Sequence, residues 1–123
     1  MRKNGFTMIE LLVAVAILAL LVSIAAPRYF GNMDRAKEDV LREDLYVMRD
    51  AIDKFYADRG RYPDTLDELV TERYLRKVPV DPFTQSARTW VLVPSEDKSV
   101  PGVHDVHSGA AHQGSDGSPL KEW

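Results

Sequence analysis

A single carboxylate lies in the long uncharged stretch near the start of this chain. Between Phe6 and Ala26 the only charged residue is Glu10. As a helix, this stretch of about 21 residues is roughly 30 Å long, which matches the hydrocarbon core of a bilayer. A carboxylate inside a membrane segment costs roughly 2.5–3.5 kcal/mol on insertion scales. We therefore expect Glu10 to have a function and a cationic partner.

The residues around this stretch leave three interpretations open. The basic pair Arg2 and Lys3 places the N-terminus in the cytoplasm by the positive-inside rule, so that the rest of the chain faces outward. One alternative is a cleaved secretory signal peptide, although its apolar region is shorter, at about 7–15 residues. Another is a plain membrane anchor in which Glu10 is incidental. The third is a segment whose acid is functional, which is the default for intramembrane acids.

The remainder of the chain gives little indication of catalysis. The sequence has 123 residues, no cysteine, and no Gly-x-Ser-x-Gly or phosphate-binding glycine loop, so we predict that it is not an enzyme. Its formal net charge of −3 gives no electrostatic case for nucleic acid as a partner. His104, His107 and His112 are candidate ligands of a transition metal, or else exposed loop histidines.

A long amphipathic helix is predicted after the apolar stretch. Pro27 is expected to close the membrane segment and kink the helix, because proline lacks a main-chain donor. From residue 34 to residue 59, apolar side chains recur at steps of three and four: Val40, Leu41, Leu45, Met48, Ile52, Phe55 and Tyr56. The opposite face is charged and includes Glu38, Asp44 and Arg49. Gly60 is expected to end the helix.

Short elements are predicted to pack against that helix. Residues 65–70 form a short helix in which Thr65 and Glu68 have capping-box spacing. Residues 89–94 and 103–106 are two strand candidates joined by a polar hairpin-like loop. Residues 108–119 are rich in glycine, serine and alanine and predict a long loop, and Trp123 is expected to fix the tail onto the sheet.

The hexapeptide Gly5-Phe6-Thr7-Met8-Ile9-Glu10 resembles the class III signal of type IV pilins and type II secretion pseudopilins. The resemblance implies that a prepilin peptidase cuts between Gly5 and Phe6 and methylates the new N-terminus. It also implies that Glu10 pairs with that amine, within one helix or between stacked subunits, where it sets the axial register. Pro27 stands where family members commonly carry a proline at which the helix bends or melts during assembly.

Three later motifs resemble the major pseudopilins of type II secretion in particular. Asp58 to Pro63 is similar to their "D-x-G-x-Y-P" corner, and Val78 to Thr84 to their "P-x-D-P-[WF]-G" turn, with threonine in place of the final glycine. Asp105 to Gly109 and Ser115 to Gly117 resemble their calcium loop. The resemblance implies calcium ligands at Ser108 and Asp116, with Asp105 as a looser candidate. The loop is longer than usual, and the second acid expected after Asp116 is absent.

The resemblance implies an α+β pilin-like fold, in which a long N-terminal helix packs on a small antiparallel sheet with a long C-terminal loop. Residues 1–5 would be a leader peptide, 6–27 a transmembrane and assembly helix, and 28–123 a periplasmic domain. The expected function is that of a structural subunit of a type II secretion pseudopilus, anchored in the inner membrane. Its expected partners are further copies of itself, minor pseudopilins, the prepilin peptidase and the inner-membrane assembly platform. The alternative is a type IV pilus subunit used for adhesion, motility or DNA uptake.

Overall fold

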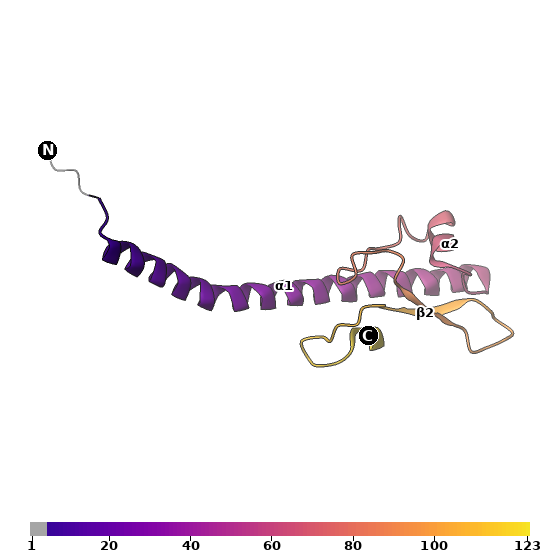
Figure 1. Ribbon diagram of the computed structural model, residues 1–123. Coiled ribbons are helices and arrows are strands. Elements are labelled where there is room, and N and C mark those ends of the chain that lie inside the picture. Colours follow the sequence, from indigo (N-terminus) through magenta and orange to yellow (C-terminus); the bar gives the residue numbers. More distant parts are fainter. Residues whose placement is uncertain (1–4) are drawn as a thin grey trace. The chain divides into compact units, whose positions relative to one another are not determined.

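The computed structural model describes residues 5–123, without the side chains of residues 27–31. In chain order the elements are α1 (Met8–Arg59), α2 (Leu66–Thr71), β1 (Val91–Pro94), β2 (Val103–His107) and the 3₁₀ helix η1 (Leu120–Glu122) (Figure 1). The two strands form one small antiparallel sheet. This arrangement is the α+β pilin-like fold that the sequence predicts, and the basic leader residues Arg2 and Lys3 lie outside the described part.

The chain divides into two compact units, one that ends at Asp34 and one from Arg35 to Trp123. In the first unit, Met8–Ala26 is a 19-residue helical segment with a mean hydropathy of 2.8, and none of it is buried. Its length and composition are sufficient to cross a bilayer once. An exposed helix that is apolar all round needs an apolar surrounding, which fits the predicted membrane segment.

The helix continues through Pro27, in agreement with the prediction of one long helix that has a membrane half and an amphipathic half. The main chain of α1 stays helical from Met8 to Arg59. A proline inside a helix removes one main-chain hydrogen bond and costs about 3 kcal/mol, and the helical residues on both sides of it outweigh that loss here. The side chain of Pro27 lies outside the described residues, so the kink at this position stays a prediction.

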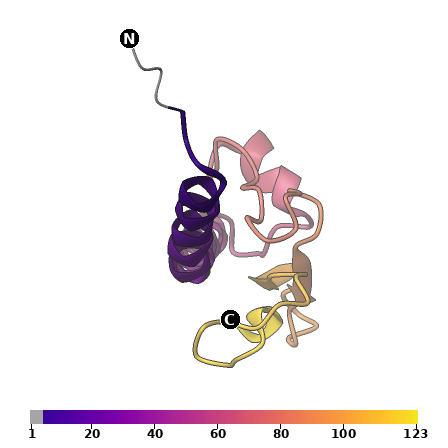
Figure 2. The same cartoon turned by 60° about the vertical axis from the view of Figure 1, so that its left-hand side comes forward.

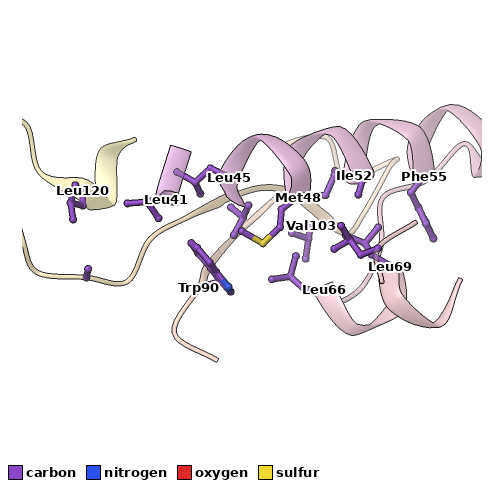
Figure 3. Close-up of a cluster of buried hydrophobic side chains, with 14 residues drawn as sticks. Leu41, Leu45, Met48, Ile52, Phe55, Leu66, Leu69, Trp90, Val103 and Leu120 are labelled. Atoms are coloured by element: carbon purple, nitrogen blue, oxygen red, sulfur yellow. The ribbon is translucent and has the colours of Figure 1, made fainter. Parts of the chain in front are cut away.

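The core of the second unit is the apolar face of α1 together with the segments that cover it. Buried residues of α1 recur at helical spacing: Leu41, Leu45, Met48, Ala51, Ile52 and Phe55. Figure 3 shows several of them pointing toward Leu66 and Leu69 of α2, and toward Trp90 and Val103 beside or in the sheet. The predicted face was wrong at its edges, because Val40 is 49% exposed and Tyr56 is 40% exposed.

The end of α1 follows the prediction for Gly60. This glycine has a φ of 68°, a left-handed conformation that suits glycine, and its N–H donates to the carbonyl of Tyr56 at 2.8 Å. The chain then turns so that the ring of Tyr62 stacks on that of Tyr56, with 4.6 Å between their centroids. The carbonyl of Pro63 accepts from the N–H of Val103 at 2.7 Å, which joins this corner to the start of β2.

The short helix α2 begins at a cap that differs slightly from the predicted one. Thr65 is its N-cap, and the Thr65 hydroxyl accepts from the N–H of Glu68 at 3.2 Å, as predicted. The Glu68 carboxylate instead accepts from the N–H of Asp64 at 2.8 Å, one residue before the expected donor. The capping box therefore includes Asp64, in the turn after Pro63, and fixes the direction of α2 relative to that turn.

The sheet pairs Leu92 with Val106 and Val93 with Asp105 in antiparallel register. It begins at Val91 and not at residue 89 as predicted, because the antiparallel pairing with β2 starts at Val91, opposite His107. The indole N–H of Trp90, just before the strand, donates to the carbonyl of Pro79 at 2.8 Å. Within the second unit, Figure 2 shows the C-terminal turn next to the sheet.

Replacement of Phe55 tests whether this core stabilises the second unit. Phe55 is fully buried, and its ring meets the edge of Tyr74 at a centroid distance of 5.3 Å. Phe55→Ala should lower the free energy of unfolding by about 3–5 kcal/mol, whereas Tyr46→Ala, on the exposed face, should change it by about 0.5 kcal/mol or less. Urea unfolding of the full chain in detergent micelles, followed by tryptophan fluorescence, measures both. Equal effects of the two variants would contradict the packing described here.

Candidate functional site

Two parts of the chain carry the predicted functional residues, and the first is the start of α1. Thr7 and Glu10 form a reciprocal capping box, because the Thr7 hydroxyl accepts from the N–H of Glu10 at 3.2 Å and a Glu10 carboxylate oxygen accepts from the N–H of Thr7 at 3.4 Å. Gly5 and Phe6 precede the helix and are exposed. A peptide bond in this position is open to a protease, since it is not part of a helix.

The geometry gives Glu10 an anionic role at a helix N-terminus. Its carboxylate accepts from the N–H of Thr7, directly before the first turn of α1, where the helix dipole stabilises negative charge. Its partner, the N–H of Thr7, belongs to the residue directly after Phe6. An amine created at Phe6 would therefore lie one residue from the main-chain group that Glu10 already contacts. The pairing of Glu10 with a new N-terminus stays a prediction.

The second part is the C-terminal loop, where Ser108 is fully buried. Its hydroxyl donates to a carboxylate oxygen of Asp81 at 2.5 Å and accepts from the N–H of Ala110 at 3.1 Å. The other carboxylate oxygen of Asp81 accepts from the N–H groups of Phe83 at 2.8 Å and Thr84 at 3.4 Å. Ser108 thus links the loop to the Asp-Pro turn, and its predicted role as a calcium ligand stays a prediction.

The importance of Asp81 was missed at the level of the sequence, where it appeared only as part of a turn motif. It is fully buried and joins two motifs that are 27 residues apart. Its charge also acts on Asp44 of α1: burial raises the pKa of Asp44, and repulsion by Asp81 and Glu43 raises it further. The available signal was the aspartate before a proline in the turn motif.

Asp105 lies in β2 and is paired with an arginine of α1. One carboxylate oxygen accepts from Nε of Arg49 at 2.8 Å and from the N–H of Val106 at 2.7 Å. Burial by itself would raise the pKa of Asp105, but the N–H of Val106 and the Arg49 guanidinium outweigh it and hold the pKa below its ordinary value. Asp105 is therefore a charged partner of α1.

Asp116 is exposed and makes its contacts within the loop. One of its carboxylate oxygens accepts from the hydroxyl of Ser118 at 2.6 Å and from the N–H of Ser118 at 3.0 Å. Those two hydrogen bonds lower the pKa of Asp116 below its ordinary value. The Ser118 hydroxyl in turn accepts from the indole N–H of Trp123 at 2.7 Å. Asp116 thus helps to hold the final residue of the chain.

The three predicted calcium ligands do not form one ligand set in this arrangement. Ser108 is bound to Asp81, Asp105 to Arg49, and Asp116 to Ser118. Calcium takes six to eight oxygen ligands around one point. Within residues 5–123, no group of three His, Cys, Asp or Glu side chains is placed to hold a metal ion. Calcium binding stays a prediction, and the contacts of these residues do not favour it.

The histidines also have separate partners. His104 lies against the ring of Tyr62 and His112 against that of Phe83, with centroid distances of 5.6 Å and 5.3 Å. The Nδ1 atom of His107 lies 2.6 Å from the main-chain oxygen of Trp123. The three side chains are packing and tail-binding groups in this fold.

Comparisons with known proteins agree with the N-terminal features. Residues 1–26 match the family described as the prokaryotic N-terminal methylation motif. The type II secretion system core protein G of Aeromonas hydrophila is 31% identical and aligns over 67% of this chain and 68% of its own length. The protein of the same name from Pseudomonas aeruginosa is 33% identical over 67% of this chain and 69% of its own length.

A third relative covers more of the chain. The type II secretion system core protein G of Escherichia coli K12 is 29% identical over 86% of this chain and 78% of its own length. No solved structure gives a significant match. The relatives carry the name of a secretion-system component and not of an enzyme, which agrees with the prediction that the chain has no catalytic function.

The pairing of Asp105 with Arg49 predicts a dependence of stability on pH. Because the folded pKa of Asp105 is lowered, the stabilisation is complete above its unfolded pKa of about 3.9 and is lost as the pH falls through the folded pKa. The difference in unfolding free energy between the wild type and Asp105→Asn should therefore shrink below a pH of about 4. Urea unfolding of both proteins at a series of pH values measures it. A constant difference down to a pH of about 2 would contradict the pairing.

Proposed function

Since this chain belongs to the type II secretion core protein G family, we propose that it is a structural subunit of a pseudopilus. One observation carries the proposal: an exposed Gly5–Phe6 bond directly precedes a capped helix that contains Glu10 and a membrane-length apolar segment. An ordinary anchor needs no acid at that position, and a signal peptide is too short to match.

The first step of the proposed function is processing. A prepilin peptidase would cut after Gly5, release residues 1–5 and methylate the amine of Phe6. The new cation and the Glu10 carboxylate attract each other strongly at the edge of a bilayer, by about 4 kcal/mol for a 4 Å separation at an effective dielectric constant of 20. Thr7 supports this pairing, because its N–H already orients the carboxylate.

The second step is assembly. The subunit would wait in the inner membrane as a single-pass protein, with residues 28–123 in the periplasm. On extraction, the apolar residues of Met8–Ala26 would exchange lipid contact for contact with the same segment of other copies, since none of this segment is buried in the single chain. A head-to-tail contact that repeats along a screw produces an open helical fibre. Minor pseudopilins and the inner-membrane assembly platform are the further partners that this function implies.

A type IV pilus subunit is the competing function, because the methylation motif is common to both classes. The names of the relatives favour the pseudopilus. A secretin and pseudopilin operon beside the gene would support the pseudopilus, and twitching-motility genes would support the pilus.

Intact mass spectrometry tests the processing step. Protein extracted from membranes that contain the prepilin peptidase should have lost Met1 to Gly5 and gained one methyl group. Membranes without the peptidase, as the control, should give the uncut chain. A chain that stays uncut in both, or one that is cut near Ala26, would identify a plain anchor or an ordinary signal peptide and would contradict the proposal.

Replacement of Glu10 tests the assembly step. Glu10→Gln keeps the size of the side chain but removes the charge that pairs with the amine of Phe6. Fibre yield, measured by shearing and sedimentation, should fall by about tenfold or more, which corresponds to a loss of about 1.4 kcal/mol per subunit. Glu96→Gln, in the exposed loop between the strands, is the matched control and should assemble normally. Normal fibres from Glu10→Gln would disprove the assigned role of Glu10.

A further inference from the structure

Two charged side chains of α1, Glu38 and Arg49, hold the C-terminal loop of the second unit. They are eleven residues apart, and eleven steps of 100° bring the helix to within about 20° of three full turns. Both residues therefore lie on the same face of α1, separated by roughly 16 Å along its axis. The sequence analysis placed both on a charged face, yet each has specific partners in the loop or the tail.

Arg49 binds oxygen atoms from two segments. Its Nε atom donates to Asp105, and its Nη2 atom donates to the carbonyl of Val106 at 3.0 Å and to the main-chain oxygen of Trp123 at 2.6 Å. A guanidinium has five N–H donors in a fixed plane, which allows one side chain to bridge β2 and the tail. The Arg49 guanidinium therefore binds the Asp105 carboxylate and two main-chain oxygens.

Glu38 binds the middle of the same loop with opposite charge. Its side chain is among the few charged groups that are buried, with 5% of the residue exposed. One carboxylate oxygen accepts from the N–H of Ser115 at 2.6 Å, and the other accepts from the Ser115 hydroxyl at 2.8 Å. Because a buried carboxylate without such donors is costly, Glu38 and Ser115 stabilise each other's position.

The set of oxygens around Arg49 is of the kind that a hard divalent cation prefers, namely carboxylate and carbonyl groups. Here the guanidinium already occupies them. Asp116, the other acid of the loop, faces a cavity of about 340 Å³ whose lining includes Arg42 and Arg49. The Arg42 guanidinium lies 4.4 Å from the centre of a Trp123 ring. Among the residues that line this cavity, Asp116 is the one acid, which is far from the six to eight oxygen ligands that calcium takes.

We infer that Arg49 and Glu38 close the C-terminal loop of this chain without a metal ion. Arg49 provides the positive charge that joins β2 to the tail, and Glu38 fixes the loop at Ser115. Neither step depends on the proposed function, because both are contacts within a single chain. The predicted calcium ligands Ser108, Asp105 and Asp116 then act as partners of protein groups.

The experiment compares order in the loop with and without calcium. Hydrogen exchange of residues 108–123 is measured by mass spectrometry on the full chain in detergent micelles, in EGTA or in calcium at about 5 mM, which exceeds the dissociation constants of extracellular calcium modules. The variants are Arg49→Gln and Glu38→Gln. Lys54→Gln is the matched control, because Lys54 forms an exposed ion pair with Asp50 on the same helix at 2.8 Å.

The wild type and Lys54→Gln should exchange equally slowly in EGTA and in calcium. Arg49→Gln should exchange about tenfold faster in the tail, and Glu38→Gln faster around Ser115, whether or not calcium is added. Faster exchange of the wild type in EGTA would overturn the inference, and so would an Arg49→Gln protein that matches Lys54→Gln. The wild-type comparison is decisive even if a variant fails to fold.

Discussion

The burial of one apolar stripe of α1 is the constraint on which the rest of residues 35–123 depends. Its Leu, Met, Ile and Phe side chains are completely or almost completely buried, and each contributes about 1.5–3 kcal/mol. The unit is small, its sheet has two strands, and α2 has six residues, so neither provides a core of its own. Both are stable because α1 offers a surface that is already formed by its own main-chain hydrogen bonds.

A second, polar framework sets the positions of the loops that cover this stripe. Asp81 holds the Asp-Pro turn through N–H groups and reaches Ser108, so that two motifs far apart in the chain share one buried hydrogen bond. The corner at Pro63 is joined to Val103 by a main-chain hydrogen bond. These contacts decide where the hairpin begins and ends, which the short strands alone would leave weakly determined.

The sequence predicted the elements that depend on periodicity and on local rules. The long helix, its glycine end and the cap at Thr65 follow from residue spacing and were confirmed, with the strand ends displaced by one or two residues. The sequence could not assign Glu38 and Arg49, because a charged side chain opposite an apolar stripe resembles any solvated one. Their partners, Ser115 and Trp123, are 77 and 74 residues away, and only the folded chain brings them together.

The closure of the C-terminal loop depends on hydrogen-bond geometry more than on net charge. The Arg49 and Asp105 side chains are 36% and 29% exposed, so water screens their attraction, and a pair of this kind contributes about 1 kcal/mol or less. The additional bonds from Arg49 to the oxygens of Val106 and Trp123 are charge-assisted, at about 1.5–3 kcal/mol each. A lysine at position 49 would keep the positive charge but lose the planar set of N–H donors that lets one side chain bind several oxygens. The loop therefore depends on an arginine in particular, held by the same helix that supplies the core.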